Sequence, residues 1–270
     1  MQRQRVLQLA GLLLVVLSIG ACSLKPIKPI ANGQQIGVVL LHGKGGDTQW
    51  IDPLASSLKN AGVQVLTPIM PWHRDRIYDK SFDDAMAEIS RHVKELRAQG
   101  ATSVFLAGHS LGAVAIAGYG ARFDDIQGII LLAPGHFTAW PKFHEHFVED
   151  LAKADKLIQD GKGDEKSAYH DMNAGKMITR FVTANVYKSW FADDGPAEFT
   201  SNMSKLKPTL PVLYIAGSND RISQTKNKQY AYAKAPKNPN SHFVIIESDH
   251  LDVPDKSDEI VIEWLRKLHQ

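Results

Sequence analysis

The pentapeptide Gly108-His109-Ser110-Leu111-Gly112 lies between a strongly apolar run and a stretch of small apolar residues. The run before it, residues 103–107 (SVFLA), is typical of a buried strand, and residues 111–119 after it are typical of a buried helix. A serine flanked in this way matches the G-x-S-x-G motif, in which a sharp strand-to-helix turn lifts the serine hydroxyl out of the sheet. The alternative is a structural turn whose serine only caps the helix.

Apolar runs and helical patterns alternate on both sides of this pentapeptide. Continuous apolar strands separated by helices indicate a parallel sheet covered on both faces, and ligands bind such sheets at the carboxyl ends of the strands. We therefore expect an α/β fold with a mostly parallel twisted sheet and helices on both faces. The predicted strands are residues 37–41, 63–66, 103–107, 129–132, 211–216 and 243–246, and the predicted helices are residues 82–99, 111–119, 223–235 and 255–269.

Residues 136–206 interrupt this alternation with a segment rich in helical patterns and aromatic residues. A structureless loop of this length is improbable inside a compact domain, so we expect an inserted helical cap. Its aromatic side chains either enclose a substrate or form only the cap's own small core. Trp140, Trp190 and Phe191 are the candidates for substrate binding.

Two further polar residues follow predicted strands. Asp220 ends Gly217-Ser218-Asn219-Asp220 after strand 211–216, and His250 follows strand 243–246. A serine hydroxyl needs an adjacent base to act as a nucleophile, and a buried carboxylate holds a basic histidine in the correct tautomer. The chain order of serine, acid and histidine fits a G-x-S-x-G turn. We therefore predict Ser110 as nucleophile, His250 as base and Asp220 as acid.

Other carboxylates compete for the role of the acid. Asp249 and Asp252 are neighbours of His250 in the chain and would have to fold back onto it. Strand 129–132 is followed by Ala-Pro-Gly-His, which offers no carboxylate there and so favours Asp220. The His, Asp and Glu residues show no spacing typical of metal ligands, and neither a metal nor a cofactor is expected.

The remaining requirement is an oxyanion hole, which is formed by N–H groups facing the reacting carbonyl oxygen. One donor should be the N–H of Leu111, the residue after the serine. The loop 42–47, His-Gly-Lys-Gly-Gly-Asp, follows strand 37–41, and its glycines allow a close approach to substrate. We assign the second donor to the N–H of Lys44, with Gly43 as the alternative. The lysine side chain is expected either in solvent or bound to an acidic substrate.

The first 22 residues have the features of a secretory signal, with a basic start, an apolar run at 9–19 and small residues before Cys22. The apolar run is shorter than the roughly 20 residues of a membrane span, although an uncleaved anchor remains the alternative. Residues 19–22, Ile-Gly-Ala-Cys, resemble the lipobox of bacterial lipoproteins. This resemblance implies removal of residues 1–21 and acylation of Cys22, and therefore attachment to a membrane of the cell envelope. Ser23 then favours the outer membrane.

The rest of the chain shows no strong charge bias. The full sequence carries 31 basic and 29 acidic residues, and two of the basic residues, Arg3 and Arg5, lie in the predicted signal. We therefore expect no nucleic-acid partner. Cys22 is the single cysteine, which excludes an internal disulfide. Residues 22–35 contain two prolines and two lysines and are expected to form a tether.

Taken together, residues 36–270 resemble serine hydrolases with the α/β-hydrolase fold, in the oxyanion loop, the serine turn, and the acid and histidine turns. One departure is the stretch 70–76, Met-Pro-Trp-His-Arg-Asp-Arg, where many members have a Pro-Gly-His-Gly-like sequence. The resemblance implies hydrolysis of a small-molecule carboxylic ester through an acyl-serine. A thioesterase, amidase or acyltransferase would use the same residues, and a non-catalytic envelope binding module is a further alternative.

Overall fold

The computed structural model describes residues 28–173, 175–222 and 227–269. The predicted signal and Cys22 lie outside these residues, as does part of the predicted helix 223–235. Within the described ranges, no helix has the length and apolar character needed to cross a membrane.

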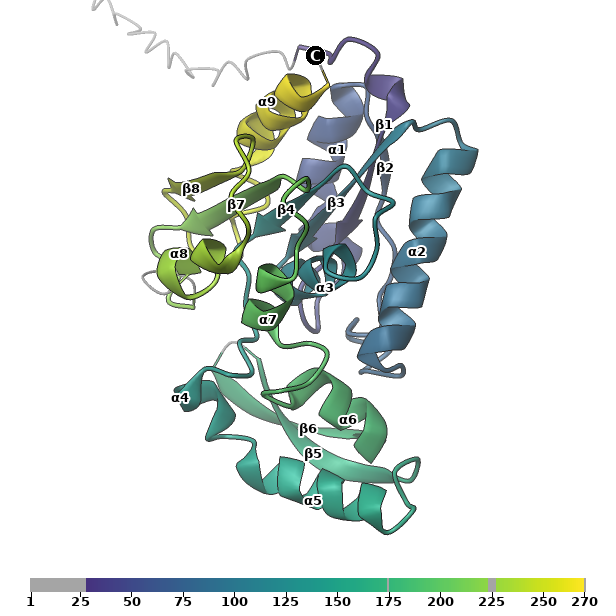
Figure 1. Ribbon diagram of the computed structural model, residues 1–270, viewed down its shortest axis with the longest axis vertical. Helices are drawn as coiled ribbons and strands as arrows, with labels where there is room; N and C mark the ends of the chain where they lie inside the picture. The colour runs from purple at the N-terminus through teal and green to yellow at the C-terminus, as the bar shows by residue number, and fades with distance from the viewer. Residues whose placement is uncertain (1–27, 174, 223–226, 270) are drawn as a thin grey trace, which may run out of the picture.

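A six-stranded sheet forms the centre of the fold, and every neighbouring pair of its strands is parallel (Figure 1). The predicted parallel sheet is therefore confirmed, and the α/β fold with it. In spatial order, the strands are β2 (Gln64–Leu66), β1 (Ile36–Leu41), β3 (Ser103–His109), β4 (Gly128–Leu132), β7 (Val212–Gly217) and β8 (His242–Ile246).

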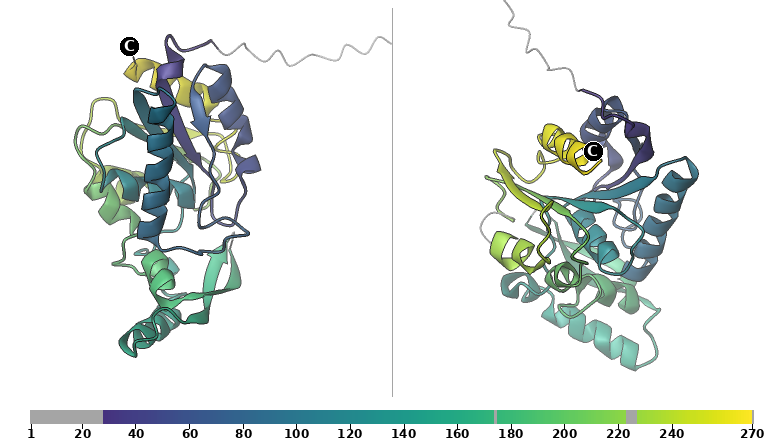
Figure 2. Two further views of the ribbon diagram at one scale, coloured as in Figure 1. Left: turned by 90° about the vertical axis from the view of Figure 1, so that its right-hand side faces the viewer. Right: turned by 45° about the horizontal axis from the view of Figure 1, so that its top comes forward.

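The side chains of β1 alternate between two separate hydrophobic cores. Val38 and Leu40 pack in the core that contains α1 (Asp52–Asn60) and α9 (Asp258–Leu268). Val39 and Leu41 pack in the core on the other face. That second core contains α2 (Phe82–Ala98) and α3 (Leu111–Gly120), and the right-hand view of Figure 2 shows helices on both sides of the sheet. This is the arrangement expected when apolar strands are buried on both faces.

Helix α2 shows how local sequence sets the limits of an element. The Ser81 side chain accepts from the N–H of Asp84, and the Asp84 carboxylate accepts from the N–H of Ser81, which forms a capping box. After the helix, Gly100 has a φ of +99°, which ends it in a conformation that favours glycine.

Most of the insertion between β4 and β7 forms a lobe below the sheet in Figure 1, while its last helix, α7 (Phe199–Ser204), lies beside α3. The insertion was predicted to be helical, but the structure also contains two strands there. Strands β5 and β6 pair as an antiparallel hairpin, with Asn173 opposite Lys176. The remaining elements of the insertion are helical, in agreement with the prediction. The insertion comprises α4 (Pro141–His144), α5 (Val148–Gln159), β5 (Lys166–Asn173), β6 (Lys176–Thr183), α6 (Ala184–Phe191) and α7 (Phe199–Ser204).

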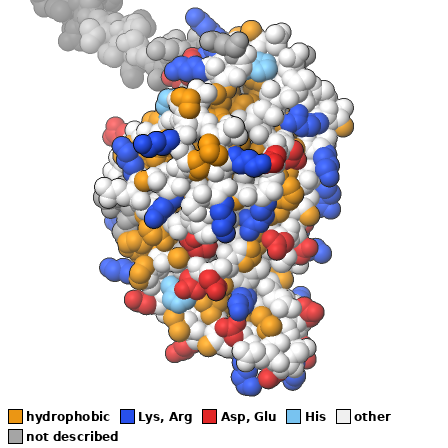
Figure 3. Space-filling model, in the orientation of Figure 1, with side chains coloured by type: hydrophobic (Ala, Val, Ile, Leu, Met, Phe, Trp, Pro, Cys, Tyr) orange, Lys and Arg blue, Asp and Glu red, His pale blue; other side chains and the backbone are white. Residues whose placement is uncertain are grey.

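Short elements complete the described fold. They are the 3-10 turns η1 (Gly33–Gln35), η2 (Thr48–Trp50) and η3 (Tyr232–Lys234) and the helix α8 (Asn227–Tyr230). Part of the predicted tether is packed on the domain, because Ile30 is buried and its N–H donates to the carbonyl oxygen of Ala61. Charged side chains of both signs are spread over the face shown in Figure 3.

Candidate active site

Ser110 sits at a strained turn between β3 and α3. Its φ of 54° and ψ of −114° are unusual for a residue with a side chain. A side chain would not fit at either flanking glycine. A Cβ on Gly108 would lie 2.5 Å from the backbone of Gly112. A Cβ on Gly112 would lie 2.7 Å from the carbonyl oxygen of His42. The packing thus explains why only glycines fit on both sides of the serine.

The turn brings Ser110 together with His250 and Asp220, from the loops after β8 and β7. The Ser110 Oγ lies 3.0 Å from His250 Nε2, and His250 Nδ1 lies 2.7 Å from Asp220 Oδ2. With Nδ1–H donating to the carboxylate, Nε2 is free to accept from the serine hydroxyl. The arrangement can transfer the serine proton to the imidazole, which is the requirement for nucleophilic attack.

The carboxylate of Asp220 is completely buried, and its second oxygen accepts from the N–H of Ile222 at 2.8 Å. The two alternative acids are engaged elsewhere. The Asp249 carboxylate accepts from the N–H groups of Leu251 and Asp252, and the Asp252 carboxylate lies 3.8 Å from the ammonium group of Lys256. Among the described residues, the ring nitrogens of His250 lie within hydrogen-bond distance of Asp220 and Ser110, and not of Asp249 or Asp252.

The loop after β1 carries the predicted second oxyanion donor. His42 Nε2 accepts from the N–H of Met70, so Nδ1 carries the proton and donates to the carbonyl oxygen of Gly43 at 2.8 Å. Burial lowers the pKa of His42 to about 4, which keeps this ring neutral. In a trans peptide the C=O and N–H groups point in opposite directions. His42 therefore also fixes the direction of the N–H of Lys44.

Neither predicted oxyanion donor, the N–H of Lys44 or the N–H of Leu111, donates to a protein acceptor within the described residues. The loop also approaches the serine closely, since a Cβ on Gly43 would lie 3.3 Å from the Cβ of Ser110. Both N–H groups are therefore unoccupied by protein acceptors in the described residues, and the loop that carries one of them approaches the turn that carries the other.

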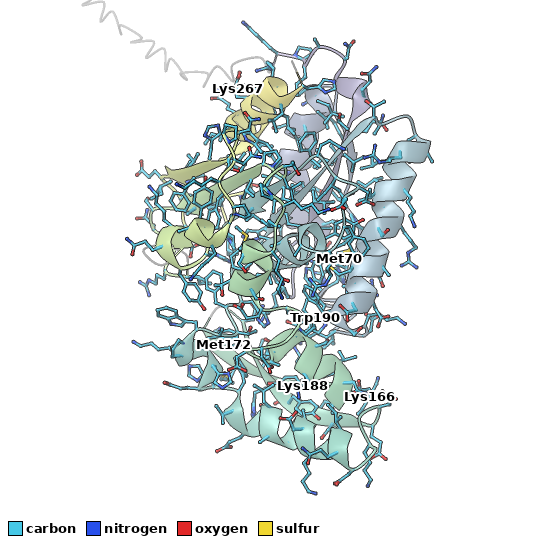
Figure 4. All side chains as sticks on the ribbon, viewed as in Figure 1. Met70, Lys166, Met172, Lys188, Trp190 and Lys267 are labelled. Atoms are coloured by element: carbon cyan, nitrogen blue, oxygen red, sulfur yellow. The ribbon has the colours of Figure 1, made fainter. Side chains whose placement is uncertain are left out.

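A cavity of about 640 Å³ opens beside Ser110 and His250, between the sheet domain and the cap. Trp140, one of the predicted substrate-binding residues, lines it. Trp190 and Phe191 are not among the described residues that line it, so the cavity does not support their predicted contact with substrate. Trp190 is fully buried at the junction of the two lobes, as Figure 4 shows. Phe191 is buried with it in the same hydrophobic core.

The packing of Trp190 explains this difference. Its ring lies among the rings of Trp72, Tyr78 and Phe82, and its Nε1 donates to the carbonyl oxygen of Lys80. The carbonyl oxygen of Trp190 in turn accepts from His136 Nε2 at 2.7 Å. The residue thus joins the cap to the sheet domain.

The Lys44 side chain is also placed differently from both expectations, because it is neither in solvent nor free to bind an acidic substrate. It is buried against the cap, where its Nζ donates to Asp171 Oδ1 at 2.6 Å. Sequence reasoning missed Asp171 because nothing in the sequence links it to residue 44. The described residues contain no group of three or more His, Cys, Asp or Glu side chains arranged to hold a metal ion.

Comparison with known proteins identifies the family. A family model described as serine aminopeptidase, S33, matches residues 34–250. The chain therefore belongs to this family, and it is a hydrolase of the α/β-hydrolase fold. A search of curated proteins gave no match.

Solved structures with low sequence identity share the fold. A structure from work on LipS and LipT, two metagenome-derived lipolytic enzymes, is 20% identical, with a TM-score of 0.61 over 91% of this chain and 98% of that one. Est1E from Butyrivibrio proteoclasticus with bound ferulic acid is 19% identical, with a TM-score of 0.58 over 90% and 91%. A Paleococcus ferrophilus monoacylglycerol lipase is 20% identical, with a TM-score of 0.58 over 89% and 96%.

Proposed function

We propose that this protein hydrolyses carboxylic esters through an acyl-serine intermediate. The observation that carries the proposal is the hydrogen-bonded series from Ser110 Oγ through the His250 ring to the buried Asp220 carboxylate. Ser110 Oγ attacks the ester carbonyl carbon while its proton passes to His250 Nε2. His250 returns this proton to the departing alcohol, and the acyl group stays on Ser110. Water, deprotonated by His250, then attacks the acyl carbon, and the acid is released as Ser110 regains its proton.

Both tetrahedral intermediates carry a negative oxygen that needs hydrogen-bond donors. The N–H groups of Leu111 and Lys44 fill this role in the proposed mechanism. Removing one such donor typically slows an enzyme by about 100 to 1,000-fold, so the positions of these two peptides matter greatly.

The cavity lining favours an ester with an apolar acyl or aryl group. Phe137, Trp140 and Phe143 supply aromatic surface from the insertion, and Ile222 and Leu251 supply aliphatic surface near the serine. Apolar lining with few polar groups is typical of small-molecule sites.

The charges around the cavity argue against an aminopeptidase, despite the description of the family. A peptide with a free amino terminus is a cation, and a buried cation needs a paired anion. The described lining residues include Lys142 and Arg221 but no Asp or Glu, and the third lysine or arginine of the lining, Lys44, is already paired with Asp171. A neutral or anionic ester suits this cavity better than an aminoacyl substrate.

The test compares a series of nitrophenyl esters, from acetyl to dodecanoyl, with nitrophenyl thioesters and alanine nitroanilide. We expect turnover of the oxygen esters, none of the nitroanilide, and loss of turnover in Ser110→Ala. Faster turnover of the nitroanilide than of every ester would contradict the proposal. Faster turnover of the thioesters than of the oxygen esters would make the protein a thioesterase, which would still react through an acyl-serine.

We propose, in addition, that Cys22 is acylated and holds the enzyme on the periplasmic side of a bacterial envelope membrane, with the outer membrane favoured. The support is the lipobox-like sequence before the single cysteine. Several acyl chains on one residue anchor a protein stably where one chain does not.

A further inference from the structure

The side chain of Lys44 connects the loop after β1 to the hairpin of the cap. Its Nζ donates to Asp171 Oδ1 at 2.6 Å and to the carbonyl oxygen of Met172 at 3.1 Å. Asn173 Nδ2 donates to the carbonyl oxygen of Lys44 at 3.4 Å. Three consecutive residues at the end of β5 therefore contact one loop residue, and Figure 4 shows Met172 at the junction of the lobes.

This contact is deeply buried. The side chain of Lys44 is 7% exposed and that of Asp171 is 0% exposed. The ammonium group also lies 5.3 Å from the ring centre of Phe191 and 5.8 Å from that of Phe143. Burial lowers the pKa of Lys44, and the charge of Asp171 opposes this effect. Without the carboxylate, the ammonium group would have to lose its charge or leave for water, because an unpaired buried cation is strongly disfavoured.

Within the loop, the other side chain that holds the backbone beside Lys44 is that of His42, whose ring donates to the carbonyl oxygen of Gly43. Gly43, Gly45 and Gly46 surround Lys44, and Gly45 has a φ of +60°. Glycines leave a backbone free to rotate, so the Lys44 side chain adds a second side-chain contact that holds this part of the loop, beside that of His42.

The backbone adds three hydrogen bonds. The N–H of Gly45 donates to the carbonyl oxygen of Trp72 at 2.8 Å, and the N–H of Gly46 donates to that of Gly43 at 3.1 Å. The N–H of Arg74 donates to the carbonyl oxygen of Gly46 at 3.4 Å.

We propose that Asp171 is a positioning residue for the reaction. Through the buried Lys44 side chain, and together with the His42 ring, it holds the peptide whose N–H serves as the second oxyanion donor. The cap thereby contributes to stabilising the transition state, in addition to covering the substrate. This inference rests on the proposed function, because it assigns a role in the same reaction to a residue that does not touch the reacting atoms.

The test compares Asp171→Asn with Asp155→Asn, a matched control in the same lobe. Asp155 forms an ion pair with Lys188, and both side chains are 44% exposed. Two quantities are measured: kcat and KM for the small substrate nitrophenyl acetate, and amide hydrogen exchange over residues 42–47. For Asp171→Asn we expect kcat to fall by about 10 to 100-fold with little change in KM. This fall is smaller than the effect of removing an oxyanion donor completely, because the N–H of Lys44 is still present but less well positioned. Exchange over 42–47 should become faster, and Asp155→Asn should resemble the wild type.

An unchanged kcat in folded Asp171→Asn, or a loss confined to KM, would overturn the inference. If the wild type itself fails to turn over esters, the proposed function fails, and hydrogen exchange alone decides whether Asp171 holds the loop. Unchanged exchange in Asp171→Asn would then reject the inference. If Asp171→Asn does not fold, Lys44→Met takes its place. In that variant the Asp171 carboxylate still has a positive partner, because Arg180 lies 3.5 Å from it. The same fall in kcat is then expected, and an unchanged kcat would again overturn the inference.

Discussion

The ring of His109 donates from Nε2 to the carbonyl oxygen of His250 at 2.8 Å. The residue before the proposed nucleophile is therefore bonded directly to the backbone of the proposed base. Burial lowers the pKa of His109 to about 4, and the nearby His250 ring contributes in the same direction. A neutral His109 that donates from Nε2 has no proton on Nδ1. The folded protein thus selects one protonation state and one tautomer of this ring.

The low pKa of His109 predicts a loss of stability in acid. Its usual value of 6.5 applies to the unfolded chain, which takes up a proton as the pH falls while the folded protein does not. Stability is then lost between about pH 6.5 and pH 4, by a few kcal/mol from this group in order of magnitude. We expect His109→Gln, which keeps a donor but does not titrate, to lose less stability over this range in urea unfolding. Equal pH slopes for both proteins would contradict the assignment.

The contact of Asp220 with His250 predicts a large effect on rate. Asp220→Asn keeps the size of the side chain but favours the wrong histidine tautomer, and kcat should fall by roughly 10⁴-fold. Asp252→Asn is the control, because the Asp252 carboxylate lies near Lys256 instead, and its kcat should be close to that of the wild type. Steady-state ester hydrolysis measures both. A large loss in Asp252→Asn alone would move the acid to that residue.

The two cap tryptophans should respond oppositely to truncation. Trp190→Ala leaves a cavity in the core between the lobes and should lower the free energy of unfolding by about 3–5 kcal/mol. Trp140→Ala removes a wall of the substrate cavity, so it should raise KM for long-chain esters with a smaller change in stability. Urea unfolding and ester kinetics on both variants check this. A stability loss in Trp140→Ala as large as that in Trp190→Ala would contradict the division of roles.

The proposed lipid anchor predicts the behaviour of Cys22→Ser. This variant should incorporate no radiolabelled fatty acid in a bacterial host and should be released as soluble protein from osmotically shocked cells. Ser23→Ala is the control and should remain labelled. Continued labelling of Cys22→Ser would reject the anchor.

The sheet could be predicted from the sequence because each strand is marked by a short apolar run of consecutive residues. Apolar runs such as 103–107 and 129–132 are buried on both faces in the structure, as expected for parallel strands. The convergence of Ser110, Asp220 and His250 was also predictable, because all three follow strands of one parallel sheet. Carboxyl ends of such strands lie along the same edge.

The hairpin β5–β6 was missed for a physical reason. The buried positions of β5 are Tyr169 and Asp171, so a charged residue stands where an alternating pattern would require an apolar one. The signal that could have revealed it is the two-residue connection, 174–175, which contains a glycine between two runs of equal length. The partner of Asp171 is Lys44, 127 residues away, and no local pattern encodes such a contact.

In the proposed reaction, Ser110 is the nucleophile and His250 activates it, and a fluorophosphonate probe tests both roles in one step. The probe should attach to Ser110, as identified by mass spectrometry of the digested protein. Labelling should be absent in Ser110→Ala and much slower in His250→Ala, because the serine hydroxyl is a poor nucleophile without its base. A folded wild-type protein that remains unlabelled, or is labelled on a different serine, would contradict the account.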